Sequence, residues 1–268
     1  MAADVHARYK LAAAQAGARL LAIRRPGRDT PAEHRTVMLA DSRVGLERLL
    51  TRLVDWDDDL EDPADLQLPR PTEPAPPPWS PAPEPTFLAC THGQHDVCCA
   101  LQGRPIAAAL AALAALLPEQ TWECSHVGGD RFAGNLVVLP AGHYFGRVDA
   151  AAALQVAEAY LGGRLMREHL RGRSSLTMPA QAAQHFAHVV TGLDAVDDLR
   201  PLGVTVLDDQ TWQIRLAVPG GSVEVTVRRT LSDERVLLTC GADEPQPPPA
   251  FELVHLLAGT SSPPDRRR

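Results

Sequence analysis

The sequence predicts an α/β protein with a mixed central domain followed by an antiparallel β meander. Three observations lead to this fold class. Short strand-like runs alternate with helix-like segments between residues 86 and 163. Four segments of alternating polarity follow between residues 203 and 240, and a proline-rich stretch precedes the central domain. The expected parts are an N-terminal α/β segment (1–62), a Pro-rich linker (63–85), the central domain (86–192), a β meander (193–245) and a tail (246–268).

Composition narrows the class of protein. The chain has 268 residues, of which 45% are hydrophobic, so it can bury a substantial core. Its net charge of -7 argues against a nucleic-acid binder, which needs a basic face. The longest apolar run, 106–117, is about half of the roughly 20 residues of a membrane span, and no leader is seen near Met1. We therefore expect a cytoplasmic protein without membrane contact. The many alanines and the single lysine, Lys10, are typical of a GC-rich bacterial genome.

The residues before the central domain give mixed signals. Runs at 19–23 and 35–39 read as strands, and the apolar residues between 44 and 53 recur at helical spacing. Acidic residues crowd between Asp57 and Asp62, and prolines then recur every few residues. We expect this stretch to be a semi-rigid, exposed linker.

The central domain begins with Thr86–Leu88, a strand that leads Cys90 into a loop. A helix with Pro105 in its first turn should follow and stop at Pro118. A strand at 121–125 and a hairpin of 136–139 with 144–148 come next, and Asp149 can cap a helix that ends at Gly162 and Gly163. This order of strand, helix, strand, hairpin and helix is that of a thioredoxin-like domain.

Two predicted elements follow the central domain. Pro179 opens a helix that reaches Val190. The meander then contains a clear hairpin, in which 213–218 turns through Pro219, Gly220 and Gly221 into 223–227.

Two segments carry the chemistry. The first is Cys90-Thr-His-Gly-Gln-His-Asp-Val-Cys98-Cys99, and the second is Cys124-Ser-His126-Val-Gly128-Gly129-Asp130. Both are expected in loops after strands at one end of the sheet, so they can converge. Thiolate and imidazole are both known ligands of iron–sulfur clusters, and the two glycines would let backbone N–H groups approach a cluster sulfide. The fifth cysteine, Cys240, is isolated and reads as a core residue.

These motifs resemble those of the sucrase/ferredoxin-like proteins. The resemblance rests on the Cys-Thr-His-Gly segment with its paired cysteines and on Cys-Ser-His-Val-Gly-Gly followed by Arg131-Phe-Ala-Gly-Asn135. Weaker similarity extends toward Cys240, whereas the first 80 or so residues match poorly. The resemblance implies a thioredoxin-like ferredoxin domain with a 2Fe-2S cluster. Sucrose hydrolysis is not expected, because no carboxylate pair stands out in the sequence.

The resemblance also implies a ligand set of two cysteines and two histidines in a His-x-x-x-His arrangement. These positions fall on Cys90, Cys99 and His126, but the second histidine is replaced by Asp130. Asp130 is one candidate for the fourth ligand. Cys124 is another, because residues two apart on a strand face the same side, and Cys98 is a third if the loop turns locally. Gly128 and Gly129 are the expected cofactor-binding backbone.

We therefore expect a non-catalytic one-electron carrier that receives its electron from a partner protein such as a reductase. The acidic run before the linker reads as a solvated face, with docking of a basic redox partner as the less favoured interpretation. A thiol–disulfide redox protein using Cys90 with Cys98 or Cys99 remains an alternative, although no Cys-x-x-Cys motif is present. A structural zinc site built from the same cysteines and His126 is another, and a redox sensor is a further possibility.

Overall fold

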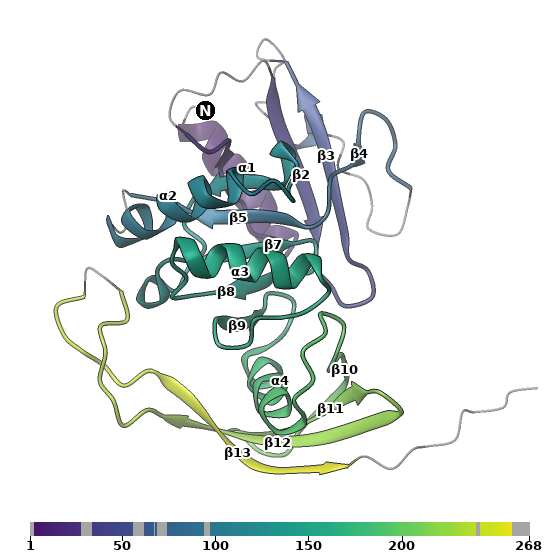
Figure 1. The fold of residues 1–268 in the computed structure, drawn as a ribbon, viewed down its shortest axis with the longest axis vertical. Coiled ribbons are helices and arrows are strands. Elements are labelled where there is room, and N and C mark those ends of the chain that lie inside the picture. The colour runs from purple at the N-terminus through teal and green to yellow at the C-terminus, as the bar shows by residue number, and fades with distance from the viewer. Residues whose placement is uncertain are drawn as a thin grey trace, which may run out of the picture.

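The computed structural model describes residues 3–27, 34–55, 62–66, 68, 74–93, 97–239 and 242–258. Figure 1 shows the elements following one another along the long axis of the molecule, with the N-terminal elements at one end and the C-terminal sheet at the other. Helices accompany a six-stranded, a four-stranded and a three-stranded sheet, so the expected α/β class is confirmed.

The six-stranded sheet is mixed and has the order β1-β6-β5-β7-β8-β9. Only β5 and β6 are paired parallel in it, and each of the other neighbouring pairs is antiparallel. The chain thus forms two inner strands joined by a crossover helix and then adds a hairpin beside the first of them. The strands are β1 (Ile23–Arg24), β5 (Thr86–Cys90), β6 (Thr121–Cys124), β7 (Leu136–Leu139), β8 (His143–Phe145) and β9 (Leu170–Arg173).

Period-two alternation divides the side chains of this sheet between two faces. In β5, Phe87 and Ala89 join the core formed with the helices α2 (Val97–Ala111) and α3 (Ala150–Leu161). Leu88 and Cys90 belong to a separate apolar cluster that includes Trp122 and Cys124 of β6. Cys90 and Cys124 are therefore register partners at the same end of two parallel strands.

The crossover helix α2 begins earlier than the sequence predicts. Pro105 is not in its first turn but in its interior, since the helix starts at Val97. A proline inside a helix removes one backbone hydrogen bond, here the one to the carbonyl of Leu101. Leu101 is exposed, so water can solvate that carbonyl. The helix also ends at Ala111, with a 3₁₀ turn, η2 (Pro118–Gln120), before β6.

Several locally coded elements are confirmed. The hairpin of β7 and β8 forms where it is expected, although β8 ends at Phe145. The carboxylate of Asp149 caps α3 by accepting a hydrogen bond from the Ala152 N–H at 2.8 Å. The helix predicted from Pro179 is α4 (Met178–Thr191). In each case a capping or turn residue lies directly at the boundary.

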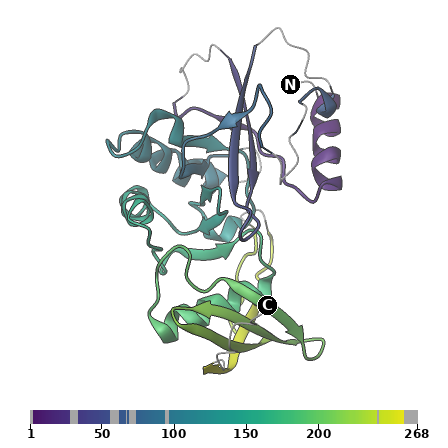
Figure 2. The ribbon, with the colours of Figure 1, turned by 90° about the vertical axis from the view of Figure 1, so that its right-hand side faces the viewer.

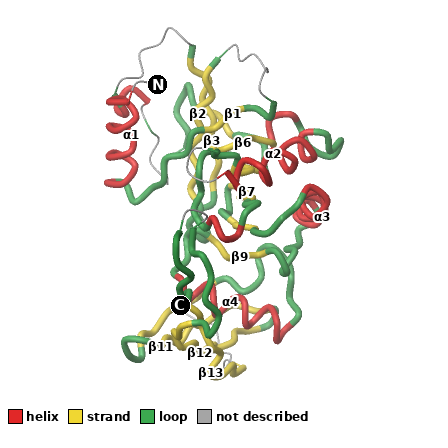
Figure 3. Tube along the Cα trace, turned by 90° about the vertical axis from the view of Figure 1, so that its left-hand side faces the viewer, coloured by secondary structure: helices red, strands yellow, loops and turns green. Residues whose placement is uncertain are grey.

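The N-terminal segment contains a helix, α1 (Ala3–Gln15), and a hairpin of β2 (Arg35–Asp41) with β3 (Arg48–Val54). The expectation of a helix between 44 and 53 is wrong, because most of this range is β3. The leucines of this range fit either periodicity, and pairing with β2 decides for the strand. Figures 2 and 3 place α1 on one side of the hairpin and α2 with α3 on the other.

The Pro-rich stretch is partly packed against this hairpin. It contains a 3₁₀ turn, η1 (Pro63–Leu66), and a short strand, β4 (Ser80–Pro81), which pairs with β3. Trp79 is buried and its indole N–H donates to the carbonyl of Leu66 at 3.1 Å. Leu66, Trp79 and Ala82 are buried, so these three residues anchor a stretch whose other described residues are mostly exposed. The acidic run falls mostly on residues 56–61, outside the described residues.

The C-terminal part is a four-stranded antiparallel sheet covered on one face by α4. The predicted hairpin is confirmed as β11 (Thr211–Val218) with β12 (Gly221–Leu231), and β10 (Pro201–Val206) lies beside β11. The expected tail instead supplies the fourth strand, β13 (Pro249–Ala258), which pairs with β12. Within the described residues, no helix has the length and apolar character needed to span a membrane.

Candidate metal centre

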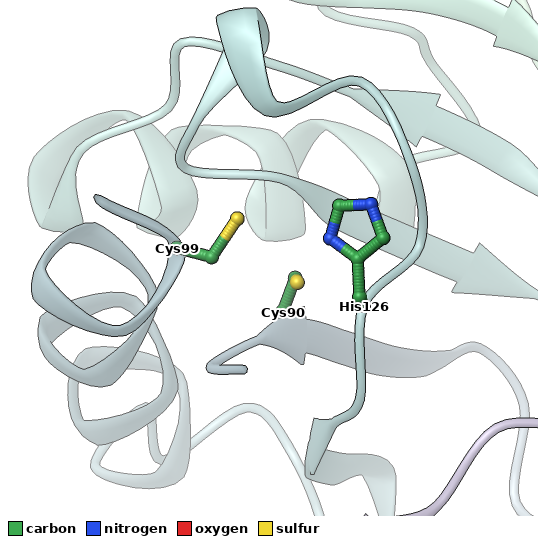
Figure 4. Close-up of side chains that lie close together, drawn as sticks. All are labelled: Cys90, Cys99 and His126. Atoms are coloured by element: carbon green, nitrogen blue, oxygen red, sulfur yellow. The ribbon is translucent and has the colours of Figure 1, made fainter. Parts of the chain in front are cut away.

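Cys90, Cys99 and His126 converge at the end of the six-stranded sheet. Their ligand atoms all lie within 4.8 Å of one another. Cys90 ends β5, Cys99 lies in the first turn of α2, and His126 follows β6. Figure 4 shows the two sulfur atoms and one edge of the imidazole ring turned toward a common space. The structure therefore brings together the three residues that the motifs single out.

A glycine allows the two cysteines to approach each other. Gly103 lies one helical turn after Cys99, where α2 crosses the end of β5. A Cβ atom at this position would lie 1.9 Å from the backbone oxygen of Cys90, a distance that no real side chain tolerates. The absence of a side chain at Gly103 thus lets the start of α2 pack against the end of β5. Its residue type and position in the sequence do not mark Gly103 as part of the site.

Both thiols of this group are fully buried. Cys99 lies among the first residues of α2, where unpaired backbone N–H groups and the helix dipole favour negative charge. This placement differs from the predicted loop, because the helix begins before the paired cysteines. Gln94, His95 and Asp96, which precede Val97 in the sequence, lie outside the described residues.

The loop after β6 turns back on itself through two glycines. Gly128 and Gly129 have φ angles of 84° and 76°, in the left-handed region that favours glycine. This turn brings Asp130, the first residue of η3 (Asp130–Phe132), back to His126. The distance between Asp130 Oδ1 and His126 Nε2 is 2.9 Å, and Asp130 is 7% exposed. Figure 4 shows the other ring nitrogen, Nδ1, on the side of the cysteines.

Two residues from outside the motif's core hold this loop. The Arg171 guanidinium donates to Asn135 Oδ1 at 2.6 Å and to the Gly128 carbonyl at 3.4 Å. The Asn135 side chain in turn donates to the Gly129 carbonyl at 3.2 Å. From the N-terminal segment, Arg19 donates to the His126 carbonyl at 3.0 Å. Arginines are common on protein surfaces, so the residue type and spacing of Arg19 and Arg171 do not mark them as parts of the site.

The remaining cysteines occupy different positions. Cys124 is a free, buried thiol in one apolar cluster with Cys90 and Cys99. Burial and the neighbouring Cys90 raise its pKa well above the usual value, while Arg19 acts in the opposite direction. β6 ends at Cys124, so the strand geometry that would align it with His126 does not extend that far. Cys98 is disulfide-bonded, and Cys240 lies outside the described residues.

His92 also approaches this group. Its ring centre lies 6.5 Å from that of His126, in a tilted arrangement. His92 is not among the ligands expected from the sequence. Its ring nitrogens also do not belong to the group of ligand atoms of Cys90, Cys99 and His126 that lie within 4.8 Å of one another.

A buried carboxylate lies one strand position before Cys124. Glu123 accepts hydrogen bonds from Arg24 Nε at 2.9 Å and from the Thr91 hydroxyl at 2.9 Å. Burial opposes its ionisation, but Arg24, Thr91 and the Gly27 N–H together lower its pKa. This ion pair fixes the edge strand β1 to β6 beside the site.

Comparison with known protein families matches residues 23–172 to the sucrase/ferredoxin-like model, which covers more than half of the chain. The chain belongs to the sucrase/ferredoxin-like family. The matched range includes β1, both cysteine and histidine segments, and ends at Gly172 in β9. No curated protein and no solved structure matches the chain. This family member thus has a group of two buried cysteines and one partly exposed histidine that could hold a metal ion.

Proposed function

We propose that this sucrase/ferredoxin-like protein holds a 2Fe-2S cluster and acts as a one-electron carrier. The observation that supports the proposal is the convergence of Cys90, Cys99 and His126 within 4.8 Å in a buried site. Two soft sulfur donors and one imidazole are the donor types that such clusters use, so the residues present fit the group. When bound, the cluster would accept and release single electrons.

The topology around the site supports the thioredoxin-like assignment. The strands β6, β5, β7 and β8 lie side by side in this order, with α2 joining β5 to β6 and α3 following β8. β7 runs antiparallel to both of its neighbours. This arrangement is typical of thioredoxin-like domains, although only the short 3₁₀ helix η3 lies between β6 and β7.

His126 and Asp130 form a unit in this proposal. Oδ1 of Asp130 lies 2.9 Å from Nε2, and this ion-pair contact leaves Nδ1 as the nitrogen that can bind iron. Histidine ligands in proteins are commonly oriented by a carboxylate in this way. Oδ1 of Asp130 is engaged by His126, which leaves Oδ2 as its one oxygen for any other contact. We therefore assign Asp130 to orientation of the imidazole.

Cys124 is then the best candidate for the fourth ligand. It is the remaining free thiol of the described chain, and it is the register partner of Cys90 on the adjacent parallel strand. Side chains at partner positions of parallel strands lie on the same face of the sheet. Cys98 is the weaker candidate because its sulfur is already in a disulfide.

The surroundings of the site offset negative charge. Arg19 and Arg171 donate to carbonyl groups of the loop from His126 to Gly129 and place two cations beside it. The N-terminus of α2 adds its dipole next to Cys99. Together these groups favour a site that gains an electron.

Burial separates the site from water but leaves one edge near the surface. Cys90 and Cys99 are fully buried, whereas the His126 side chain is 20% exposed. An electron can therefore enter or leave most directly at the imidazole edge. The same burial argues against disulfide exchange through Cys90 and Cys99, because an attacking thiolate needs access.

The test is the metal content of anaerobically purified protein. We would quantify iron, acid-labile sulfide and zinc, and record visible absorption and the EPR spectrum of the reduced protein. About two irons and two sulfides per chain are expected. Stoichiometric zinc, which the same donors can bind tetrahedrally, or a colourless protein without metal would overturn the proposal.

Variants identify the ligands. Cys124→Ala is expected to abolish or strongly shift the spectrum, whereas Asp130→Asn should keep the cluster with an altered reduction potential. Cys98→Ala serves as the control with an unchanged spectrum. Loss of the cluster in Asp130→Asn, combined with a normal spectrum in Cys124→Ala, would make Asp130 the fourth ligand instead.

A further inference from the structure

Three arginines surround the ring of Phe132, beside the loop that carries His126. The guanidinium carbons of Arg171, Arg131 and Arg147 lie 4.4, 4.6 and 5.5 Å from the centre of the ring. They come from three places in the chain, since Arg131 belongs to η3, Arg147 follows β8, and Arg171 lies in β9. We call these four residues the Phe132 arginine cluster.

The arrangement depends on specific backbone positions. A Cβ atom at Gly129 would lie 2.2 Å from Arg171 Nη2, and one at Gly146 would lie 2.5 Å from Arg171 Cδ and 2.8 Å from Phe132 Cβ. Arg147 itself has a φ angle of 55°, which is unusual for a residue with a side chain. Such conformations cost free energy and persist where the surrounding structure requires them. The cluster is thus held in place by two glycines and a strained arginine.

The three cations are only partly balanced by charge, since the Asp130 carboxylate acts on Arg171 without forming an ion pair. Among the described residues, none of them forms an ion pair with a carboxylate, whereas Arg24, Arg173 and Arg228 each do. Burial and the charge of Arg147 both lower the pKa of Arg131, and burial lowers that of Arg171. A protein with a net charge of -7 therefore keeps three repelling cations around one ring.

The compactness of the cluster indicates what it binds. A surface that docks an acidic protein spreads its charges over a wide area, but here each guanidinium lies within 5.5 Å of one ring centre. Guanidinium groups pair with phosphate oxygens through parallel hydrogen bonds, and several can share one multivalent anion. Arg147 is exposed, so the site is open to solvent.

We propose that the Phe132 arginine cluster binds a phosphate-type oxyanion, either free or as the phosphate group of a nucleotide or another phosphorylated small molecule. This site requires neither metal nor electron transfer and so stands apart from the proposed function. Arg147 and Arg131 contact the anion from the solvent side. Arg171, which also holds Asn135 and the Gly128 carbonyl, forms the inner wall.

The experiment is isothermal titration of the full chain with inorganic pyrophosphate and, separately, with ADP at low ionic strength. Saturable binding of one anion per chain is expected. Arg131→Gln and Arg147→Gln should each weaken it roughly tenfold or more, since each removes a charge-assisted contact. Arg228→Gln is the matched control. Arg228 lies in β12, outside the Phe132 arginine cluster, and it is already paired with Glu252.

The two titrants separate the sources of the phosphate. Equal affinity for pyrophosphate and ADP supports recognition of the phosphate alone, whereas tighter binding of ADP supports a nucleotide. Absence of saturable binding up to millimolar concentrations overturns the proposal. The proposal is also overturned if Arg131→Gln, Arg147→Gln and the control Arg228→Gln all have the same dissociation constant, because the anion would then be attracted by the overall charge and not by the cluster. Circular dichroism of each variant checks that the fold is retained.

Discussion

The six-stranded sheet buries ionisable side chains, whereas the four-stranded sheet buries mainly apolar ones. The first buries Glu123, His143 and Arg173 in its strands, and Asp130 is buried in η3 beside it. The core of the second is built from valine, leucine and isoleucine of β11 and β12 packed on alanines of α4. The family match covers the first sheet and ends before α4 begins.

This difference reflects what each region must do. Burial of a charged or polar group costs free energy unless partners compensate it, and apolar side chains of similar volume often stabilise a fold better. The core of the four-stranded sheet is apolar, as this argument favours. The six-stranded sheet departs from it at Glu123 and Asp130, which flank the cysteines and His126. The six-stranded sheet thus combines an apolar core under α2 and α3 with buried ionisable groups beside the candidate site, whereas the four-stranded sheet has the apolar core alone.

The strongest test of this division is Gly103→Ala. The new Cβ would meet the backbone oxygen of Cys90, so α2 must move away from β5. We expect a loss of roughly 3 kcal/mol or more in the free energy of unfolding, together with loss of metal binding. Urea unfolding and metal analysis measure both. Gly203→Ala in β10, where a Cβ meets nothing within 4 Å, is the matched control. Full metal content in Gly103→Ala would mean that this close contact does not position Cys99.

The next effect concerns acid. His143 is buried in β8 with Nδ1 3.0 Å from the Tyr160 hydroxyl, and burial lowers its pKa from 6.5 to about 3. In the unfolded chain His143 is therefore protonated as the pH falls below about 6.5, whereas in the native protein it stays neutral down to about pH 3. Stability present above pH 6.5 should fall as the pH drops toward 3, with a loss of roughly 2 kcal/mol by pH 4.5.

His143→Gln separates this effect from other titrations. Glutamine can still bond to Tyr160 but does not titrate, so the slope of unfolding free energy against pH between 6.5 and 4.5 should flatten. Chemical denaturation at several pH values measures the slope. An unchanged slope would assign the acid sensitivity to other groups.

A smaller effect compares the two cores directly. Ile106 in α2 and Ile214 in β11 are both fully buried. Truncation of either to valine should cost about 1 kcal/mol, since one methylene is lost. Only Ile106→Val is expected to change the absorption or EPR spectrum of the metal centre. A spectral change in Ile214→Val would show that the two regions are coupled.

The smallest effect is expected at the surface of the four-stranded sheet. Arg228 and Glu252 form an exposed ion pair at 3.4 Å between β12 and β13. Arg228→Gln should change the unfolding free energy by about 0.5 kcal/mol or less. Thermal unfolding at low and high salt measures it. A loss several times larger would mean that the pair supports the packing of β13.

The sequence predicts features that depend on neighbouring residues and fails where a feature depends on residues far apart in the chain. Asp149, Pro179 and the turn at Pro219 mark boundaries because a cap or turn acts on its immediate neighbours. The leucines at 49, 50 and 53 fit both the helical and the strand period, and only pairing with β2 makes this segment the strand β3. The sequence does not mark β13 as part of the sheet, because a long connection separates it from its partner strand β12.

In the candidate site, too, the sequence identifies residues within short motifs but not the contacts between distant residues. Its cysteines and histidine lie in two short segments, so residue type and spacing identify them. Gly103 is different, because its role depends on the approach of a carbonyl 13 positions earlier in the chain. The orientation of His126 by Asp130 depends in turn on the two left-handed glycines between them. These contacts are properties of the folded chain.

The pairing of β1 with β6 has a consequence for folding. The salt bridge of this edge joins residues 99 positions apart, from Arg24 to Glu123. During synthesis, Ile23 and Arg24 leave the ribosome long before their partner strand exists. Closing so long a segment is entropically costly and is slow relative to local contacts. The first strand of the sheet to be made must therefore wait for β6, and until the two pair, β6 offers an open edge to any other extended chain.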